Sequence, residues 1–331
     1  MDAIDVQALP VARWLHVIEP EYFAEYLPAG GAAAKFVIAD QDAADLLLSA
    51  TGPLAQRHNM LPIQINAGTT RLHMLQDVFF AIARALPWDA LLQHYVEDLF
   101  SRHGYPWPRP GDALTMQALA QEFGVAATLL DRSRDQWLSR DLWGDATLAQ
   151  DFRSAMLCLC IARLEPDSLT PDTGSAAPGS PIMQWLHGEK IGLAMLRQYE
   201  IAARINRTSA RAMLVSLCHF LRKAASNGLL LTLDLRPALR VAAAGAVPPP
   251  AGSLRYTQAA VMDLYEVLRE VIDDIEHLPG LFLLGLADQA LLAGDRRRTL
   301  DNYKALEMRI WPDVRPGDRQ NPLAPLVTLS G

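Results

Sequence analysis

A short segment near the N-terminus constrains the fold of this chain more than any other feature. Residues 36–38 form an apolar run that suits a buried strand, and residues 39–45 are all small, polar or acidic. An apolar, helix-like stretch begins at Leu46. A buried strand that leads through a tight loop into a helix is the layout of phosphate-binding loops. The segment therefore predicts an α/β fold with this loop at one end of a strand.

The residues that would make such a loop bind phosphate are missing. The motif needs glycines whose N–H groups approach the phosphates, a lysine that reaches the β- and γ-phosphates, and a serine or threonine for Mg²⁺. Here the glycine positions hold Ala39, Asp42 and Ala44, the lysine position Asp45, and the serine or threonine position Leu46. A carboxylate beside polyphosphate would repel it by on the order of several kcal/mol at an effective dielectric near 20.

This alignment predicts an ATPase shape without ATPase activity. ATP and Mg²⁺ are not expected as cofactors at the usual place, although a different ligand in the same crevice is possible. No metal site is expected.

Composition narrows the class of protein. The 331 residues are half hydrophobic and one-fifth charged, as in globular proteins with a sizeable core. The formal net charge of −7 argues against a protein dominated by nucleic-acid phosphate contacts, although it is compatible with a local basic patch. The acidic N-terminus does not resemble a signal peptide, and no apolar stretch is long enough for a bilayer, so the cytoplasm is the expected location.

The three cysteines do not suggest a disulfide framework. Cys158, Cys160 and Cys218 lie in apolar runs and are expected in the core. A zinc site with His187 or His219 is the alternative, but no C-x-x-C pair supports it.

Alternating strand and helix patterns predict a largely parallel sheet. Residues 165–181 are expected to form a flexible loop and residues 246–252 a stiffer connector. We expect a single three-layer domain over residues 1–331, with a large helical insertion at about 70–226 between the second and third strands. The strand runs are 35–38, 61–66, 229–233 and 281–286, and the helical patterns are 72–86, 88–100, 115–123, 146–164, 209–225 and 257–277.

Several segments resemble one family, the BREX-system ATP-binding proteins. These are P-loop ATPases of bacterial anti-phage defence islands, related to AAA+ and origin-recognition-type ATPases. The most specific match is the sequence Asn-Pro-Leu-Ala-Pro-Leu at 321–326. The matching segments follow the family's order and cover residues 25–48, 75–86, 210–234, 256–288 and 303–329.

The resemblance implies a Walker B pair after the third strand, in which an aspartate positions Mg²⁺ and a glutamate polarises water. Asp234 and Leu235 occupy these positions, so the catalytic carboxylate is replaced. Asp288 falls where such ATPases place a polar sensor residue. Family members continue into a helical lid, whereas this chain stops at Gly331, so we expect no C-terminal lid.

The combined losses favour a catalytically inactive pseudo-ATPase that acts as a scaffold or regulatory subunit of a bacterial anti-phage defence complex. The expected partners are an active ATPase relative, a helicase or a DNA-modifying subunit, with DNA reached through the complex. Two alternatives stay open: an active or partner-completed ATPase, and a DNA-binding adaptor.

Other residues have two interpretations each. Arg296, Arg297 and Arg298 form a solvated basic turn or contact nucleic acid or an acidic partner. Trp107, in a proline-rich loop, packs against the domain or anchors an interface.

Asp42 and Asp45 are expected to form a polar helix start with Asp42 as its cap. The alternatives are a partner contact, and a ligand or cation site in which Asp40, Asp42 and Asp234 meet. Arg309, Arg315 and Arg319 are candidate arginine fingers.

Overall fold

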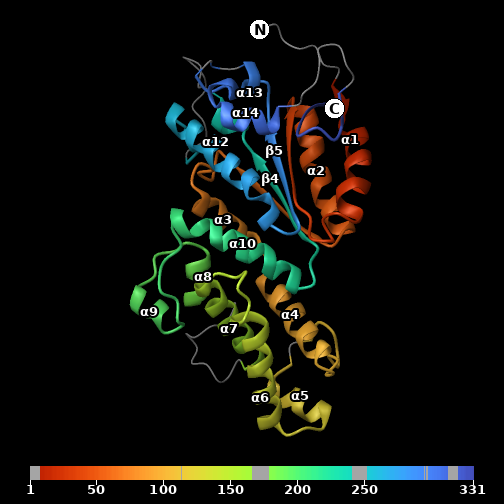
Figure 1. Cartoon of the computed structure of the whole chain (residues 1–331), viewed down its shortest axis with the longest axis vertical. Helices are drawn as coiled ribbons and strands as arrows, with labels where there is room; N and C mark the ends of the chain where they lie inside the picture. Colours follow the sequence, from red (N-terminus) through yellow and green to blue (C-terminus); the bar gives the residue numbers. More distant parts are fainter. Residues whose placement is uncertain are drawn as a thin grey trace. The chain divides into compact units, whose positions relative to one another are not determined.

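The computed structural model describes residues 8–112, 114–165, 179–240, 252–293, 295, 297–311 and 320–331 (Figure 1). The chain divides into two compact units, which are residues 1–78 with 227–331, and residues 79–226. The second unit falls inside the expected helical insertion. Most of the two expected loops lies outside the described residues, as do Arg296, Arg315 and Arg319.

The first unit contains a six-stranded, all-parallel sheet. The strand order is β1-β6-β2-β5-β4-β3. Every residue of β4 and β5 is buried, as central strands covered on both faces require. The α/β class and the four predicted strands are confirmed, and β1 and β6 were not predicted. The strands are β1 (Leu9–Pro10), β2 (Ala33–Ala39), β3 (Met60–Asn66), β4 (Gly228–Asp234), β5 (Leu281–Ala287) and β6 (Leu326–Ser330).

Helices cover both faces of this sheet (Figure 1). The connection after β2 runs towards β3, whereas those after β4 and β5 run the opposite way. Because such crossovers are right-handed, the two directions place their helices on opposite faces. One face carries α1 (Val11–Ile18) and α2 (Gln41–Arg57), and the other carries α12 (Gln258–Asp273) and α14 (Lys304–Ile310). Shorter elements are η1 (Glu19–Ala24), α11 (Arg236–Leu239), η3 (Ile275–His277), α13 (Ala290–Ala293) and η4 (Leu300–Asn302).

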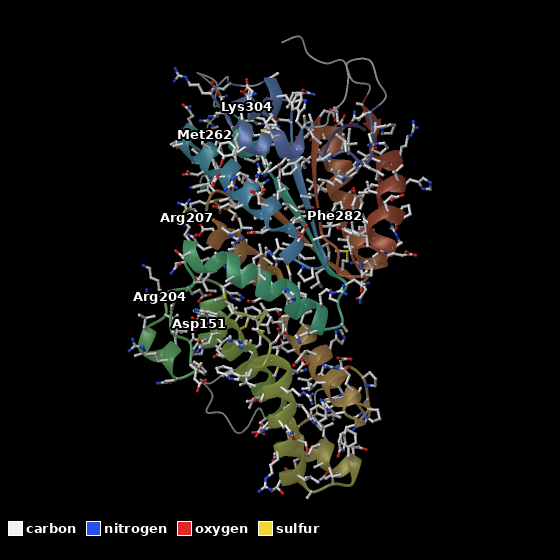
Figure 2. All side chains as sticks on the ribbon, viewed as in Figure 1. Asp151, Arg204, Arg207, Met262, Phe282 and Lys304 are labelled. Carbon is white, nitrogen blue, oxygen red and sulfur yellow. The ribbon has the colours of Figure 1, made fainter. Side chains whose placement is uncertain are left out.

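Aromatic side chains fill the core between the sheet and α1. Phe282 of β5, labelled in Figure 2, lies 4.8 Å from Phe23 between ring centroids and is fully buried. Trp14 is buried as well, and its indole N–H donates to the Pro322 carbonyl at 3.0 Å. This bond ties α1 to the segment that leads into β6.

One glycine is required by close packing inside the sheet. Gly285 of β5 lies opposite Phe36 of β2, and a Cβ at this glycine would lie 2.5 Å from the Phe36 ring. Because Gly285 has no Cβ, strand β5 leaves room for the Phe36 ring.

The described part of the second unit is helical. Tyr95, Phe152 and Phe220 pack in its core. The predicted helices recur with shifted ends, while α6, α8 and α9 were not predicted. The helices are α4 (Trp88–Arg102), α5 (Met116–Phe123), α6 (Ala127–Leu138), η2 (Ser139–Trp143), α7 (Gln150–Leu164), α8 (Pro181–Leu186), α9 (Leu193–Arg197) and α10 (Arg207–Lys223), and α3 (Leu75–Ala85) begins in the first unit and ends in the second.

The cysteines of this unit are free thiols. Cys160 and Cys218 are buried as predicted, and Cys158 is partly exposed. Burial raises the pKa of Cys158 to about 11 and that of Cys218 to about 12, which keeps both thiols protonated at neutral pH. Within the part of the chain that the structure describes, no three His, Cys, Asp or Glu residues are arranged to hold a metal ion. None of the described helices is both long and apolar enough to cross a membrane.

Candidate functional site at the carboxyl edge of the sheet

Three acidic residues stand at the carboxyl ends of neighbouring strands. Asp40 follows β2, Asp234 ends β4 and Asp288 follows β5. The connections after β2 and β5 leave in opposite directions although these two strands are adjacent. In open α/β sheets, ligands bind in the crevice at such a switch point. This edge is therefore the candidate functional site.

The segment aligned with a phosphate-binding loop is not a loop. Asp40 alone separates β2 from α2, which begins at Gln41. The Asp40 carboxylate accepts a hydrogen bond from the backbone N–H of Ala43 at 2.8 Å, so Asp40 is the N-cap. The expected loop over residues 39–45, the helix start at Leu46 and the capping role of Asp42 are therefore wrong. An aspartate after a strand, followed by helix-forming alanines, is itself a helix start.

The aligned residues lie on different surfaces of these elements. Ala39 is buried at the end of β2, and Ala44 is buried under α2. Asp42, Asp45 and Leu46 are exposed on the first turns of α2. The N–H of Ala44 donates to the Asp40 carbonyl at 3.0 Å, as in any helix. The N–H groups of Ala43 and Ala44 are therefore both bonded to Asp40, whereas a phosphate loop turns such groups towards its ligand.

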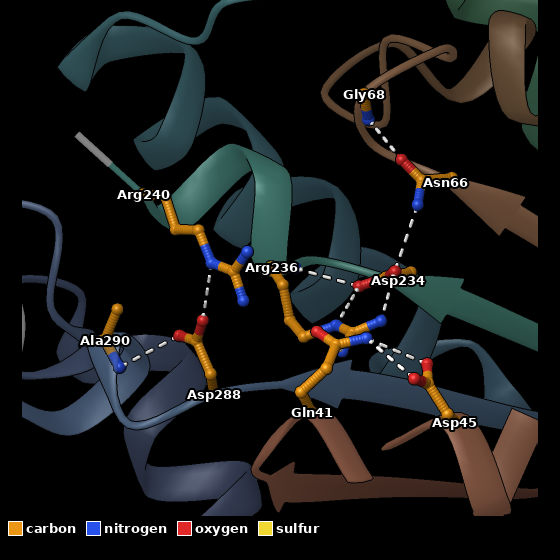
Figure 3. Close-up of polar contacts among 9 residues, drawn as sticks. All are labelled: Gln41, Asp45, Asn66, Gly68, Asp234, Arg236, Arg240, Asp288 and Ala290. Atoms are coloured by element: carbon orange, nitrogen blue, oxygen red, sulfur yellow. Dashed lines mark hydrogen bonds and ion pairs between the residues drawn. The ribbon is translucent and has the colours of Figure 1, made fainter. Parts of the chain in front are cut away.

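Asp234 is neutralised by a residue of its own chain. The Arg236 guanidinium donates from Nε to one Asp234 oxygen and from its second terminal nitrogen, Nη2, to the other, both at 2.9 Å (Figure 3). Asn66 of β3 donates to the same carboxylate at 3.0 Å. The side chains of Asp234 and Arg236 are each 8% exposed. Hydrogen bonding to Asp234 raises the pKa of Arg236 above its ordinary value.

The local backbone explains this pair. Strand β4 ends at Asp234, and the chain turns at Leu235 into the short helix α11, which starts at Arg236. The backbone N–H of Arg236 also donates to the Asp234 carboxylate, at 3.2 Å. The turn therefore brings the arginine side chain back over the strand end.

The Arg236 guanidinium also joins two other elements. Its Nη1 donates to the Gln41 side chain at 3.2 Å, and Gln41 donates to both Asp45 oxygens at 2.9 and 3.0 Å. Asn66 accepts from the N–H of Gly68 at 2.7 Å. The network links β3, β4, α2 and α11. It gives Asp234 a cationic partner, Arg236, from the same chain.

The remaining candidates at this edge are also engaged by the chain itself. Leu235 is buried, and its backbone N–H donates to the Leu286 carbonyl at 2.8 Å. Asp288 accepts from Arg240 at 2.9 Å and from the N–H of Ala290 at 3.0 Å. A leucine cannot act as a general base, and the Asp288 carboxylate binds the first N–H of the short helix α13.

A pocket of about 530 Å³ opens beside this network at the ends of β2, β5 and β6. Its polar lining includes Asp40, Asp288, Thr328 and Ser330. None of the described residues that line it is basic. The pocket thus presents carboxylates and hydroxyls where a triphosphate would require cations.

The arginines expected in a basic turn do not share one environment. The Arg298 guanidinium donates to the carbonyls of Ala238 at 3.2 Å and Tyr256 at 2.8 Å, and its side chain is 14% exposed. Arg298 therefore points into the protein, so a solvated turn is wrong for this residue. Arg297 is exposed. Arg309 is hydrogen-bonded to Asp273. To act as an arginine finger, it would first have to break these hydrogen bonds.

Trp107 is 7% exposed, which favours packing within its own unit over an interface anchor. Its indole N–H donates to the Asp112 carbonyl at 3.1 Å. Its ring meets the edge of Phe100 at 5.6 Å between centroids.

The sequence analysis missed the groups that complete the site, namely Arg236, Gln41, Asn66 and Arg240. One signal was available, because Asn66 and Asp234 end strands that pair in register. Nothing in the sequence indicates that Arg236 folds back onto Asp234.

Comparisons with known proteins assign no family to this chain. No family model matches it, and searches of curated proteins and of solved structures found no match. Fold and site together define an α/β protein with a parallel sheet. The acidic residues at its strand ends, Asp40, Asp234 and Asp288, bind groups of the same chain.

Proposed function

We propose that this chain is a pseudo-ATPase, a non-catalytic scaffold or regulatory subunit with a P-loop NTPase-like core. The observation that carries the proposal is the Arg236–Asp234 pair. At the position that the BREX resemblance assigns to the Mg²⁺-binding Walker B aspartate, the carboxylate already holds a cation of its own chain.

The sheet order supports an AAA+-like arrangement of this core. Without the two-residue strand β1, the order is β6-β2-β5-β4-β3. Strand β5, which leads to Asp288, therefore lies between the strand before the loop-like segment and the strand that ends at Asp234. A sensor residue that reports on both phosphate and metal would need this central position.

Three requirements of ATP hydrolysis conflict with the geometry of this edge. The N–H groups of Ala43 and Ala44 are bonded to Asp40, Asp234 is occupied by Arg236, and Leu235 stands where a general base is needed. A Mg²⁺ ion could bind Asp234 only if the buried ion pair with Arg236 were broken. Breaking such a pair costs about 3–5 kcal/mol.

The proposed role is therefore to hold or regulate partners in a bacterial anti-phage defence complex. The partners proposed are an active ATPase relative, a helicase or a DNA-modifying subunit. The defence role rests on the resemblance of the sequence segments, and the non-catalytic role rests on the site.

Calorimetry with ATP and Mg²⁺ on the purified chain tests the non-catalytic role. We expect no binding heat and no phosphate release, and the same result for an Asp45→Lys variant, because restoring one lysine does not recreate a loop. Micromolar ATP binding, or turnover abolished by Asp234→Asn, would refute the proposal and establish an unusual ATPase.

A second experiment tests the scaffold role. The chain is co-expressed with the active ATPase of a BREX-type system, and complex formation and ATP turnover are measured. A stable complex with altered turnover is expected. Unchanged turnover without a complex would refute the regulatory role even if the chain binds no ATP.

A further inference from the structure

The pocket at the ends of β2, β5 and β6 has the size of a small-molecule site. Its volume of about 530 Å³ lies within the range of roughly 300–1,000 Å³ that is usual for such sites. Five of its ten described lining residues are polar, and the others, which include Ile38 and Leu329, are apolar. Pockets that hold an organic molecule and orient it by a few hydrogen bonds have such a mixed lining.

The sheet places two hydroxyl groups at this pocket. Thr328 and Ser330 are two residues apart in β6, so their side chains point to the same face of the sheet. Ile38 of β2 pairs in register with Thr328 and therefore lies on that face as well. Neither hydroxyl has a hydrogen-bond partner among the described residues. Both can therefore bind a molecule in the pocket.

Two carboxylates stand at the ends of the neighbouring strands β2 and β5. Ile38 and Ala287 are the last residues that pair between these strands, and Asp40 and Asp288 follow them closely. Asp288 has a cationic partner, Arg240, at 2.9 Å (Figure 3). Asp40 caps α2 with one oxygen and forms no ion pair with a described residue. The pocket therefore has one carboxylate without a counter-charge.

An anion does not suit this pocket. No basic residue is found in the described part of its lining. The N-terminus of α2 would attract an anion through the helix dipole, but Asp40 already caps it and Asp42 adds a carboxylate to its first turn. Carboxylate and hydroxyl oxygens instead accept hydrogen bonds from N–H donors. The lining therefore favours a cation that carries such donors.

The ligand best suited to these walls is aliphatic. The described lining residues include no aromatic side chain on which a nucleobase or another flat ring could stack. Ile38 and Leu329 instead offer apolar contact to an alkyl chain. At one end of such a chain, an ammonium or guanidinium group could bind Asp40 by charge-assisted hydrogen bonds, which are roughly twice as strong as neutral ones. Its remaining N–H groups could donate to Thr328 and Ser330.

We propose that this pocket binds a small organic cation, an alkyl amine or alkyl guanidine. The charged group binds Asp40, and the alkyl chain lies against Ile38 and Leu329. This inference goes beyond the pseudo-ATPase role and does not depend on it, because a cation in the pocket leaves the pair between Asp234 and Arg236 intact. Calorimetry with ATP and a titration with an amine therefore test the two proposals separately.

A ligand-observed NMR titration of the full chain with agmatine tests this proposal. Agmatine carries a guanidinium and an ammonium group on a short alkyl chain, and we expect a dissociation constant of about 1 mM or tighter. Asp40→Asn should weaken binding by about tenfold or more, because it removes the charge-assisted hydrogen bond but keeps a good helix cap. Thr328→Val should weaken binding by roughly two- to tenfold, because it removes one hydroxyl.

Asp42→Asn is the matched control. It makes the same change in net charge on the first turn of α2, but Asp42 does not line the pocket. Its affinity for agmatine should stay within about twofold of that of the native chain. No agmatine binding at about 10 mM, or equal losses in Asp40→Asn and Asp42→Asn, would overturn the proposal.

Two competing ligands sharpen the test. Tetramethylammonium has the positive charge but no N–H donor, so it should not displace agmatine. Displacement at equal concentration would mean that only the negative charge of the protein attracts cations, and would overturn the proposal. Tighter binding of the tripeptide glycyl-arginyl-glycine than of agmatine would also overturn it, and would assign the pocket to an arginine side chain of a partner protein.

Discussion

Replacement of Arg236 by methionine is the most direct perturbation of the sheet edge. Methionine keeps much of the volume and apolar contact of the arginine stem but removes the cation. Asp234 would lose both guanidinium hydrogen bonds and keep those from Asn66 and from the backbone N–H of residue 236. The carboxylate would then be buried with only neutral partners.

The size of the effect follows from burial. Both side chains of the pair are 8% exposed, so solvent replaces the lost contact poorly. Removing one partner of a buried ion pair costs about 3–5 kcal/mol, whereas replacing both partners by apolar residues is often neutral or stabilising. Arg236→Met should therefore destabilise the chain by about 3 kcal/mol or more. Asp234→Asn/Arg236→Met should recover most of this loss, because it removes the buried charge and keeps an oxygen for the Asn66 side chain and the N–H of residue 236.

Urea unfolding of the native chain, both single variants and the double variant completes the cycle. Unfolding of the two units is followed separately if the transition is not two-state, because a single midpoint would then mix them. A cost below about 1 kcal/mol for Arg236→Met would mean that the pair is solvated. A double variant as unstable as the sum of the singles would mean that the two residues act independently, which would refute the reasoning about this site.

Further predictions concern β2, β5 and α2. Burial lowers the pKa of Lys35 from 10.5 to about 8, so between these values the unfolded chain binds more protons and the lysine's contribution to stability rises with pH. The unfolding free energy of the native chain minus that of Lys35→Met should rise by about 2 kcal/mol from pH 7 to pH 9.5 in urea titrations, and a flat difference would contradict a buried ammonium. Gly285→Ala should lower the thermal midpoint, at a cost of about 1–3 kcal/mol, because its Cβ would collide with Phe36. Gly52→Ala, within α2 and with no atom near its Cβ, should instead stabilise by about 0.5–1 kcal/mol, and destabilisation by both variants would count against the packing argument.

The local sequence pattern predicted the elements that leave a clear signal in consecutive residues. Strands β4 and β5 are continuous apolar runs because both sheet faces are covered, and they were located to within one residue. Strand β1 has only two residues, which is too short to show an alternating hydrophobic pattern. It pairs with β6, about 320 residues away in the chain. The start of α2 was misplaced because the loop alignment was preferred over the capping signal of Asp40.

The sequence by itself determined the α/β class and the central strands, because these depend on residue type and local spacing. Only the tertiary structure decided that Asp40 caps α2, that Arg236 neutralises Asp234 and that Arg298 turns inward. The physical reason is that the environment of a charge is set by neighbours from other elements. Asn66 and Gln41 reach Asp234 and Arg236 across about 170 and 195 residues of chain, and no local pattern encodes such contacts.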